Sequence, residues 1–188
     1  MAKKKHRTIF RRSTAAIDDE GRKQCFIMYG ASAIVLWKHH NRKQLAISRL
    51  FKVSREVWHE CTLTNEKSMI QMCEQETGIE IRNESGKSWR DLPYLNGSLD
   101  PGKMTGPQWV YMRQQQVKWV APQVMACIMI ALHRKWGFGF DRCAKFYSQV
   151  EEIKREYDND PMKIQTACLE LTGINVMDTV MERRQQIE

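Results

Sequence analysis

A chain of 188 residues can bury one sizeable hydrophobic core, so we expect a single compact body. Its 30 lysines and arginines outnumber 22 aspartates and glutamates, and the formal net charge of +8 predicts attraction to polyanions, because neutralising phosphates releases counterions. The long apolar run that includes 125–132 is much shorter than the roughly 18 residues of a membrane-spanning helix, which excludes a transmembrane protein. A basic protein without a nucleic-acid role remains possible.

The first 20 residues predict a flexible basic arm, because they contain many cations and few residues that could join a core. The cations are Lys3, Lys4, Lys5, Arg7, Arg11 and Arg12. This arm either lies along phosphates or serves only as a solubilising tail. No apolar segment follows Arg7, so the start of the chain does not resemble a secretory signal, and we expect a cytoplasmic protein.

Residues 21–82 form the first predicted helical block. From 23 to 40, apolar residues recur at steps of three and four, as on the buried face of an amphipathic helix. Asn41 follows this pattern and is expected to cap the next helix. A further helix should begin after Thr64 and stop near Gly78, since glycine commonly terminates helices.

The segment 44–58 has the spacing of a helix-turn-helix, the module whose second helix enters the major groove of DNA. Ile47 occupies the position of a core anchor, and Ser54 lies at the start of the predicted second helix. Lys52 stands where a helix-turn-helix usually has the glycine of its turn, and Trp58 stands where it usually has a small β-branched residue. Both departures argue against sequence-specific DNA recognition. We expect nucleic acid to contact basic and polar residues in and before this segment: Arg42, Lys43, Arg49, Lys52, Ser54, Arg55 and His59. The alternative is a basic face that meets only solvent.

Residues 83–106 are rich in glycine, proline and asparagine and predict a loop-rich connector. The second helical block, 107–188, opens with a long helix. Pro122 within this helix predicts a kink or a break near Trp119, and the apolar residues 120–132 should form the central core element. Five cations of this block are expected to extend the positive surface: Arg113, Lys118, Arg134, Lys135 and Arg142.

The chain contains a weak internal repeat. When it is compared with itself at a shift of 95 positions, 73–79 aligns with 168–174, and both segments begin with cysteine and end in Thr-Gly-Ile. If the repeat is a duplication, the two blocks should pack about an approximate twofold axis. The alternative is two unrelated helices that each end in a glycine cap.

The element 133–142 joins the central helix to the next one through a Gly-Phe-Gly turn followed by arginine. It resembles a turn of small proteins from bacterial viruses and prophages, and the resemblance implies a biological setting without an activity. Gly137 and Gly139 permit a positive φ, Phe138 can anchor the turn, and Asp141 can cap the following helix.

Candidate catalytic and metal-binding residues are isolated in the sequence. His59 and Cys61, like His39 and His40, lack the second ligand pair that a zinc site needs. The six cysteines include no closely spaced pair and are expected as reduced thiols in the core. No phosphate-binding glycine loop occurs. We therefore expect no metal, no cofactor and no enzymatic activity.

These patterns predict an all-α protein, a helical bundle of about six to seven helices, which the repeat would arrange as two pseudo-symmetric halves. The expected function is non-enzymatic binding of duplex DNA by a protein of a phage or another mobile element. The alternative is an anti-CRISPR-like inhibitor of a host defence nuclease, which would bind a host protein or nucleoprotein complex. Steep salt dependence of binding to free DNA favours the first function.

Overall fold

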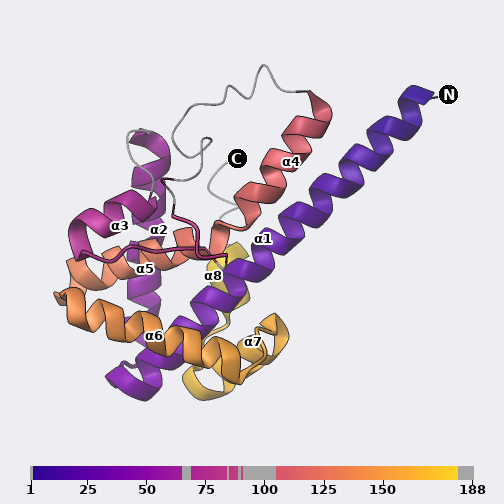
Figure 1. Ribbon diagram of the computed structural model, residues 1–188. Helices are drawn as coiled ribbons and strands as arrows, with labels where there is room; N and C mark the ends of the chain where they lie inside the picture. Colours follow the sequence, from indigo (N-terminus) through magenta and orange to yellow (C-terminus); the bar gives the residue numbers. More distant parts are fainter. Residues whose placement is uncertain (1, 65–68, 84, 89, 91–104, 182–188) are drawn as a thin grey trace.

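The computed structural model describes residues 2–64, 69–83, 85–88, 90 and 105–181, and the regular elements in these ranges are helices (Figure 1). In chain order they are α1 (Ala2–His40), α2 (Gln44–Thr64), α3 (Met69–Thr77), α4 (Gly106–Val117), α5 (Val120–Trp136), α6 (Phe140–Glu156), α7 (Pro161–Thr172) and α8 (Val176–Met181). The predicted all-α bundle is confirmed. None of the helices in the described ranges has both the length and the apolar character needed to cross a bilayer.

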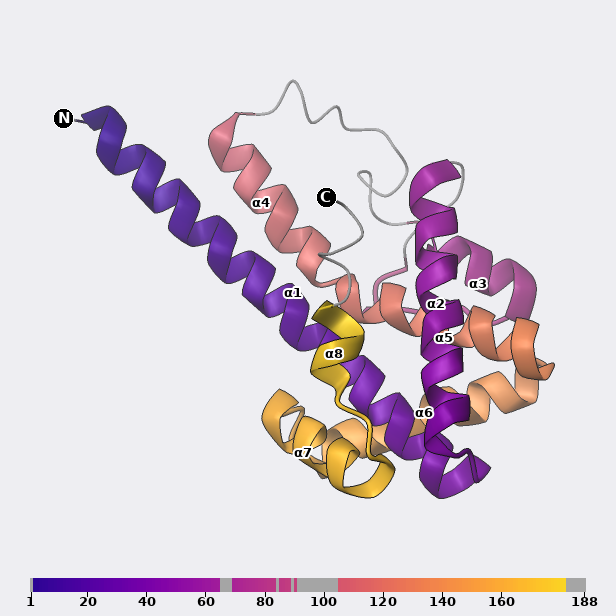
Figure 2. The ribbon, with the colours of Figure 1, turned by 180° about the vertical axis from the view of Figure 1, so that it is seen from behind.

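Helix α1 extends over 39 residues, about 58 Å at 1.5 Å per residue, and is much longer than the predicted helix 23–40. Its N-terminal half stands away from the bundle and runs beside α4 in both views (Figures 1 and 2). An ion pair of 2.9 Å between Asp18 and Arg113 joins the two helices. The segment expected as an irregular arm is therefore helical from Ala2 onward.

Helix α5 is the central core element, as predicted. All residues from Ala121 to Leu132 except Gln123 are buried. Pro122 has no amide hydrogen to donate to the preceding turn, and the long helix breaks just before it, between α4 and α5. Trp119, which is only 1% exposed, fills this bend, so the predicted break near Trp119 is confirmed.

Helices α3 and α7 end in the same way. Each is followed by a glycine in the left-handed region, Gly78 at φ +76° and Gly173 at φ +71°. In each, the last threonine, Thr77 or Thr172, donates its hydroxyl to the carbonyl oxygen four residues earlier at 2.7 Å. The same hydroxyl accepts the amide of the isoleucine two residues later, at 3.3 and 3.1 Å. The aligned Thr-Gly-Ile segments thus share their hydrogen bonds as well as their sequence.

The two halves exchange packing partners. Helices α2 and α3 pack against α5, whereas α6 and α7 pack against α1. Gly78 lies against Phe140, the first residue of α6, so that a Cβ atom on this glycine would be 3.2 Å from Phe140 Cδ2. Gly173 lies in the same way against Gln44, the first residue of α2, whose side-chain amide donates to the Gly173 carbonyl at 2.7 Å. Reciprocal contacts of this kind are those that a twofold axis generates.

The turns that follow α1 and α5 are also equivalent. Asn41 at φ +48° and Gly137 at φ +62° lie 96 positions apart, and both end a helix in the left-handed conformation. The amide of Arg42 donates to the carbonyl of Leu36 at 3.0 Å, which satisfies an end of α1. The prediction that Asn41 caps α2 is therefore wrong, because it terminates α1 instead. Asp141 likewise lies in the first turn of α6 rather than at its N-cap.

Candidate nucleic-acid interface

The predicted helix-turn-helix is absent, because 44–64 is one uninterrupted helix. Lys52 and Val53, at the predicted turn, lie in the middle of α2. The helix continues past Lys52 and Val53 because buried side chains recur at helical spacing on both sides of them. A turn at this position would interrupt that buried face. Its members are Ile47, Leu50, Phe51, Ser54, Val57 and Cys61.

Ser54 belongs to the core and is unavailable to a ligand. Its side chain is fully buried, its hydroxyl donates to the carbonyl of Phe51 at 2.8 Å, and it shares a hydrogen bond of 3.1 Å with the hydroxyl of Tyr29. The Tyr29 ring meets the Phe51 ring edge-on, with centroids 4.8 Å apart. The prediction that Ser54 contacts nucleic acid is therefore wrong, since it joins α1 to α2.

Three of the predicted residues, Arg49, Lys52 and His59, lie on the outer face of α2 and are exposed. The same face carries Glu56 and Glu60, so its positive charge is diluted. Arg55 is half-buried at the flank of this face, where it lines a polar cavity between α2 and the start of α8. The outer face of α2 is therefore a mixed-charge surface.

The turn that follows α1 places Arg42 and Lys43 against tryptophan rings. The Arg42 guanidinium carbon lies 4.3 Å from the centroid of Trp136, at the end of α5, and the Lys43 ammonium lies 5.6 Å from the centroid of Trp37. The Nε atom of Arg42 is buried beneath this stack. Cation–π contacts of this kind hold cations in place without neutralising them.

The turn that follows α5 also carries cations. Arg142 lies over the ring of Phe138 at 5.1 Å and donates to the carbonyl of Gly137 at 2.6 Å. Lys135 and Lys145, which precede and follow this turn, are exposed. Phe138 is buried as predicted, so it anchors the turn in the core.

His40 shows that the two turns meet. Its ring lies 5.3 Å from the ring of Phe138, and its Nε2 atom is 3.2 Å from Oε1 of Gln149 on α6. Burial lowers the pKa of His40 below its usual value, and the nearby positive charges of Arg42 and Lys145 lower it further, although the Gln149 hydrogen bond opposes the shift. Cations from both halves therefore surround one histidine.

We call this end of the bundle the two-turn surface and define it by five cations: Arg42, Lys43, Lys135, Arg142 and Lys145. Asp141 is the acidic residue within its second turn. Sequence reasoning named four of these cations but missed Lys145. Aligning Asn41 with Gly137, at a shift of 96 rather than 95, would have placed the two turns at equivalent positions.

Several other cations of the body are neutralised by ion pairs. Arg134, expected to extend the positive surface, binds Glu60 at 2.7 Å and Glu76 at 2.6 Å, and these carboxylates raise its pKa. Arg90 binds Glu74 at 2.7 Å, and Arg113 is paired with Asp18 as described above. Charge is therefore distributed unevenly over the bundle.

The remaining excess charge lies at the start of α1. Six lysines and arginines and none of the acidic residues precede Asp18, which leaves 24 basic and 22 acidic residues in the rest of the chain. The N-terminal half of α1 thus accounts for most of the net charge of +8. This half projects from the bundle (Figure 2).

The six cysteines are buried and form no disulfide, as expected for core thiols. Burial raises the pKa of Cys61 to about 11, of Cys73 to about 12 and of Cys143 to about 11. Such thiols stay protonated at neutral pH and are poor nucleophiles. Within the described residues, no three His, Cys, Asp or Glu side chains converge closely enough to hold a metal ion.

Comparison with known proteins gives no match: no protein family, no curated protein and no solved structure is significantly similar to this chain.

Proposed function

We propose that the protein binds the phosphate backbone of duplex DNA, without a catalytic step, and that the two-turn surface makes the principal contact with the DNA. The observation that supports this proposal is the meeting of the two turns, which brings Arg42 from one turn and Lys145 beside the other close to His40, with the exposed lysines Lys43 and Lys135 on the same turns. In this proposal the protein acts in the cytoplasm and is encoded by a phage or prophage, as the resemblance of 133–142 implies.

The aromatic rings suit these cations to phosphate. Trp136 holds Arg42 at one turn, and Phe138 holds Arg142 at the other. A guanidinium group stacked on a ring keeps N–H groups in its plane free to donate, and its restricted motion reduces the entropy lost on binding. Contacts to phosphates carry no sequence information, so we propose binding with little sequence preference.

A competing role for these cations is purely structural. Helices α1 and α5 both end at the two-turn surface, and lysine or arginine near a helix C-terminus stabilises the negative end of the helix dipole. Removing the charges would then lower stability without changing DNA binding. The proposed function requires the opposite result, a large loss of DNA binding in a folded protein.

The test neutralises three exposed lysines of the surface in one variant, Lys43→Gln, Lys135→Gln and Lys145→Gln. Binding to a labelled random-sequence duplex is measured by fluorescence anisotropy across a salt series. Each lost phosphate contact should flatten the slope of log K against log salt by about 0.9, so the variant should lose about 2.7 units of slope.

A matched control carries the same loss of charge elsewhere, as Lys87→Gln, Lys118→Gln and Lys163→Gln, all exposed in the described structure. This control should keep most of the affinity and the slope of the natural chain. Equal losses in both variants would mean that only net charge matters, and they would refute the two-turn surface as a site. Circular dichroism of both variants checks that the helices remain.

The basic half of α1 is proposed as a second contact. Deleting residues 2–17 removes six lysines and arginines. Among the described residues of the buried core, it removes only Ile17. The shortened chain should remain folded and bind DNA more weakly, with a further loss of slope. Unchanged affinity would restrict the proposed interface to the bundle.

A further inference from the structure

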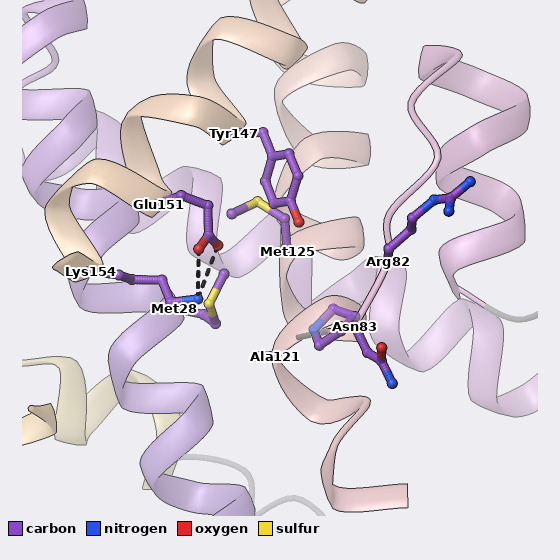
Figure 3. A pocket seen from close by; sticks show the side chains of 9 residues that line it. Met28, Arg82, Asn83, Ala121, Met125, Tyr147, Glu151 and Lys154 are labelled. Carbon is purple, nitrogen blue, oxygen red and sulfur yellow. Dashed lines mark hydrogen bonds and ion pairs between the residues drawn. The ribbon is translucent and has the colours of Figure 1, made fainter. Parts of the chain in front are cut away.

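Charge is balanced differently in the cavity between α1, α5 and α6 and at the two-turn surface. In the cavity, Lys154 donates to Glu151 at 3.0 Å (Figure 3). Arg82, at the edge of the cavity, binds Glu80 at 2.8 Å. Within the described ranges, none of the five cations that define the two-turn surface forms an ion pair. An approaching anion therefore meets unbalanced positive charge at the two-turn surface and not in the cavity.

The contact at the centre of the two-turn surface occurs twice. His40 and Trp136 are the last residues of α1 and α5 and lie 96 positions apart. The Phe138 ring packs on His40, with centroids 5.3 Å apart, and Arg42, 96 positions before Phe138, packs on Trp136. The amides of Arg42 and Phe138 both donate to the carbonyl oxygen six residues earlier, at 3.0 and 3.4 Å. Equivalent positions thus hold a ring that can take up a proton in one half and a ring that cannot in the other, so the fold alone does not require the histidine.

His40 is held in one orientation by its neighbours on α6. Its Nε2 atom lies 3.2 Å from Oε1 of Gln149, an oxygen that only accepts hydrogen bonds, so Nε2 carries a hydrogen. Nδ1 is then the nitrogen that binds a further proton. The rings of Phe138 and Phe146 lie beside the imidazole, with centroids 5.3 and 6.1 Å away. This apolar setting disfavours the charged imidazolium.

The charged and titratable groups that act on His40 come from three elements. They are His39 on α1, Arg42 on the turn after α1, and Lys145 on α6. The turn after α5 presents the uncharged Phe138, and the acidic residue that follows this turn, Asp141, is exposed. Burial is the main cause of the lowered pKa of His40, and the three positive neighbours lower it further, whereas the Gln149 hydrogen bond raises it. An anion that neutralises Arg42 and Lys145 removes this repulsion and favours the imidazolium.

We infer that His40 couples DNA binding at the two-turn surface to the uptake of one proton from solvent, so that the protein binds DNA more tightly as the pH falls. This inference rests on the proposed function. Phosphates that contact Arg42 and Lys145 supply the negative charge that the imidazolium lacks in the free protein. Coupling between two ligands is reciprocal, so a proton that binds better in the complex strengthens DNA binding by the same factor.

The direct test is NMR of the protein between pH 5 and pH 8, free and bound to a random-sequence duplex. The signal of the His40 Cε1 proton reports the pKa of this ring, and the pKa should be higher in the complex. The affinity for the same duplex, measured by fluorescence anisotropy at constant salt, should be about threefold to tenfold higher at pH 5.5 than at pH 8, since a pKa higher by one corresponds to about a tenfold gain.

Three variants separate His40 from other histidines and from other charges. His40→Gln removes the nitrogen that takes up the proton and should lose the gain in affinity at low pH. His59→Gln removes an exposed histidine on the outer face of α2 and should keep the gain. Lys145→Gln, studied without DNA, should raise the pKa of His40, because one of the positive charges that lower it is gone.

The outcomes distinguish this inference from the proposed function. Absence of DNA binding at every pH would refute the proposed function and, with it, the role of His40. DNA binding with the same His40 pKa in the free and bound protein, or with the same pH dependence in His40→Gln, would overturn only the role of His40. An unchanged His40 pKa in Lys145→Gln would overturn that role without any reference to DNA.

Discussion

A substitution at Gly30 tests the exchange of packing partners between the two halves directly, because Gly30 lies where α1 of the first half meets α7 of the second. A Cβ atom at this position would be 2.6 Å from Cγ2 of Ile164 and 3.7 Å from Cγ2 of Val176. Cγ2 of isoleucine is bonded directly to the branched Cβ, so it moves only with a stiff χ1 rotation. Gly30→Ala should therefore push α7 away from α1.

The expected change in the free energy of unfolding for Gly30→Ala follows from two opposing effects. Replacing a glycine by alanine within a helix gains about 1 kcal/mol of helix propensity. Forcing an extra methyl group into a packed core costs roughly 1–3 kcal/mol. The net effect of Gly30→Ala should be a destabilisation of up to about 2 kcal/mol. At Gly21, a Cβ would meet only Val120 Cγ2 at 3.8 Å, so Gly21→Ala should stabilise by about 1 kcal/mol.

The assay is urea unfolding followed by circular dichroism at 222 nm. The two variants change the same residue type in the same helix, and their free energies of unfolding should differ by roughly 1–3 kcal/mol, with Gly21→Ala the more stable. In an Ile164→Ala background, Gly30→Ala should become stabilising, since the obstructing methyl group is gone. Equal stability of Gly30→Ala and Gly21→Ala would refute the close packing of α1 on α7.

Three further predictions follow from other contacts. Ser54→Ala should lower stability by about 1–2 kcal/mol, because it removes the buried hydrogen bond between the Ser54 and Tyr29 hydroxyls, yet it should leave DNA affinity unchanged; weaker binding in a folded variant would return this residue to the interface. His40 has a lowered pKa in the folded state, mainly from burial, so the unfolded chain binds the proton more readily and the free energy of unfolding should fall as pH drops below about 6.5. His40→Gln should reduce this pH dependence in urea titrations, and an unchanged profile would contradict the assignment. Fragments 1–90 and 91–188 should fold only together, as a one-to-one complex in size-exclusion chromatography, because each supplies the helix on which the other packs; a folded single fragment would contradict the exchange.

Local features of the chain could be predicted from its sequence, and contacts between distant segments could not. Pro122 marked the break before α5 and Gly78 the end of α3, because each acts on the backbone within a few residues. The helix-turn-helix prediction failed because it matched spacing around Lys52 without weighing the buried stripe that continues past it. A repeat pattern predicted two halves, but only the fold showed that Gly78 lies against Phe140 of the other half.

The candidate site was only partly predictable for the same reason. Arg42 and Lys43 stood out as a basic pair, but their stacking on Trp136 and Trp37 depends on how helices cross. Arg134 looked equally available in the sequence, yet two glutamates from other helices neutralise it. Charge can be counted from a sequence, whereas its pairing depends on the fold.

The most direct measurement of the central claim is the affinity of the natural chain for a random-sequence duplex between 50 and 200 mM salt. Five phosphate contacts at the two-turn surface predict a slope of about −4.5 in log K against log salt, which weakens binding roughly 500-fold over this range. Contacts from the basic half of α1 would make the slope steeper. Absence of binding at 50 mM salt, or an affinity that changes less than about threefold across the series, would contradict the claim that this protein binds DNA through its basic surface.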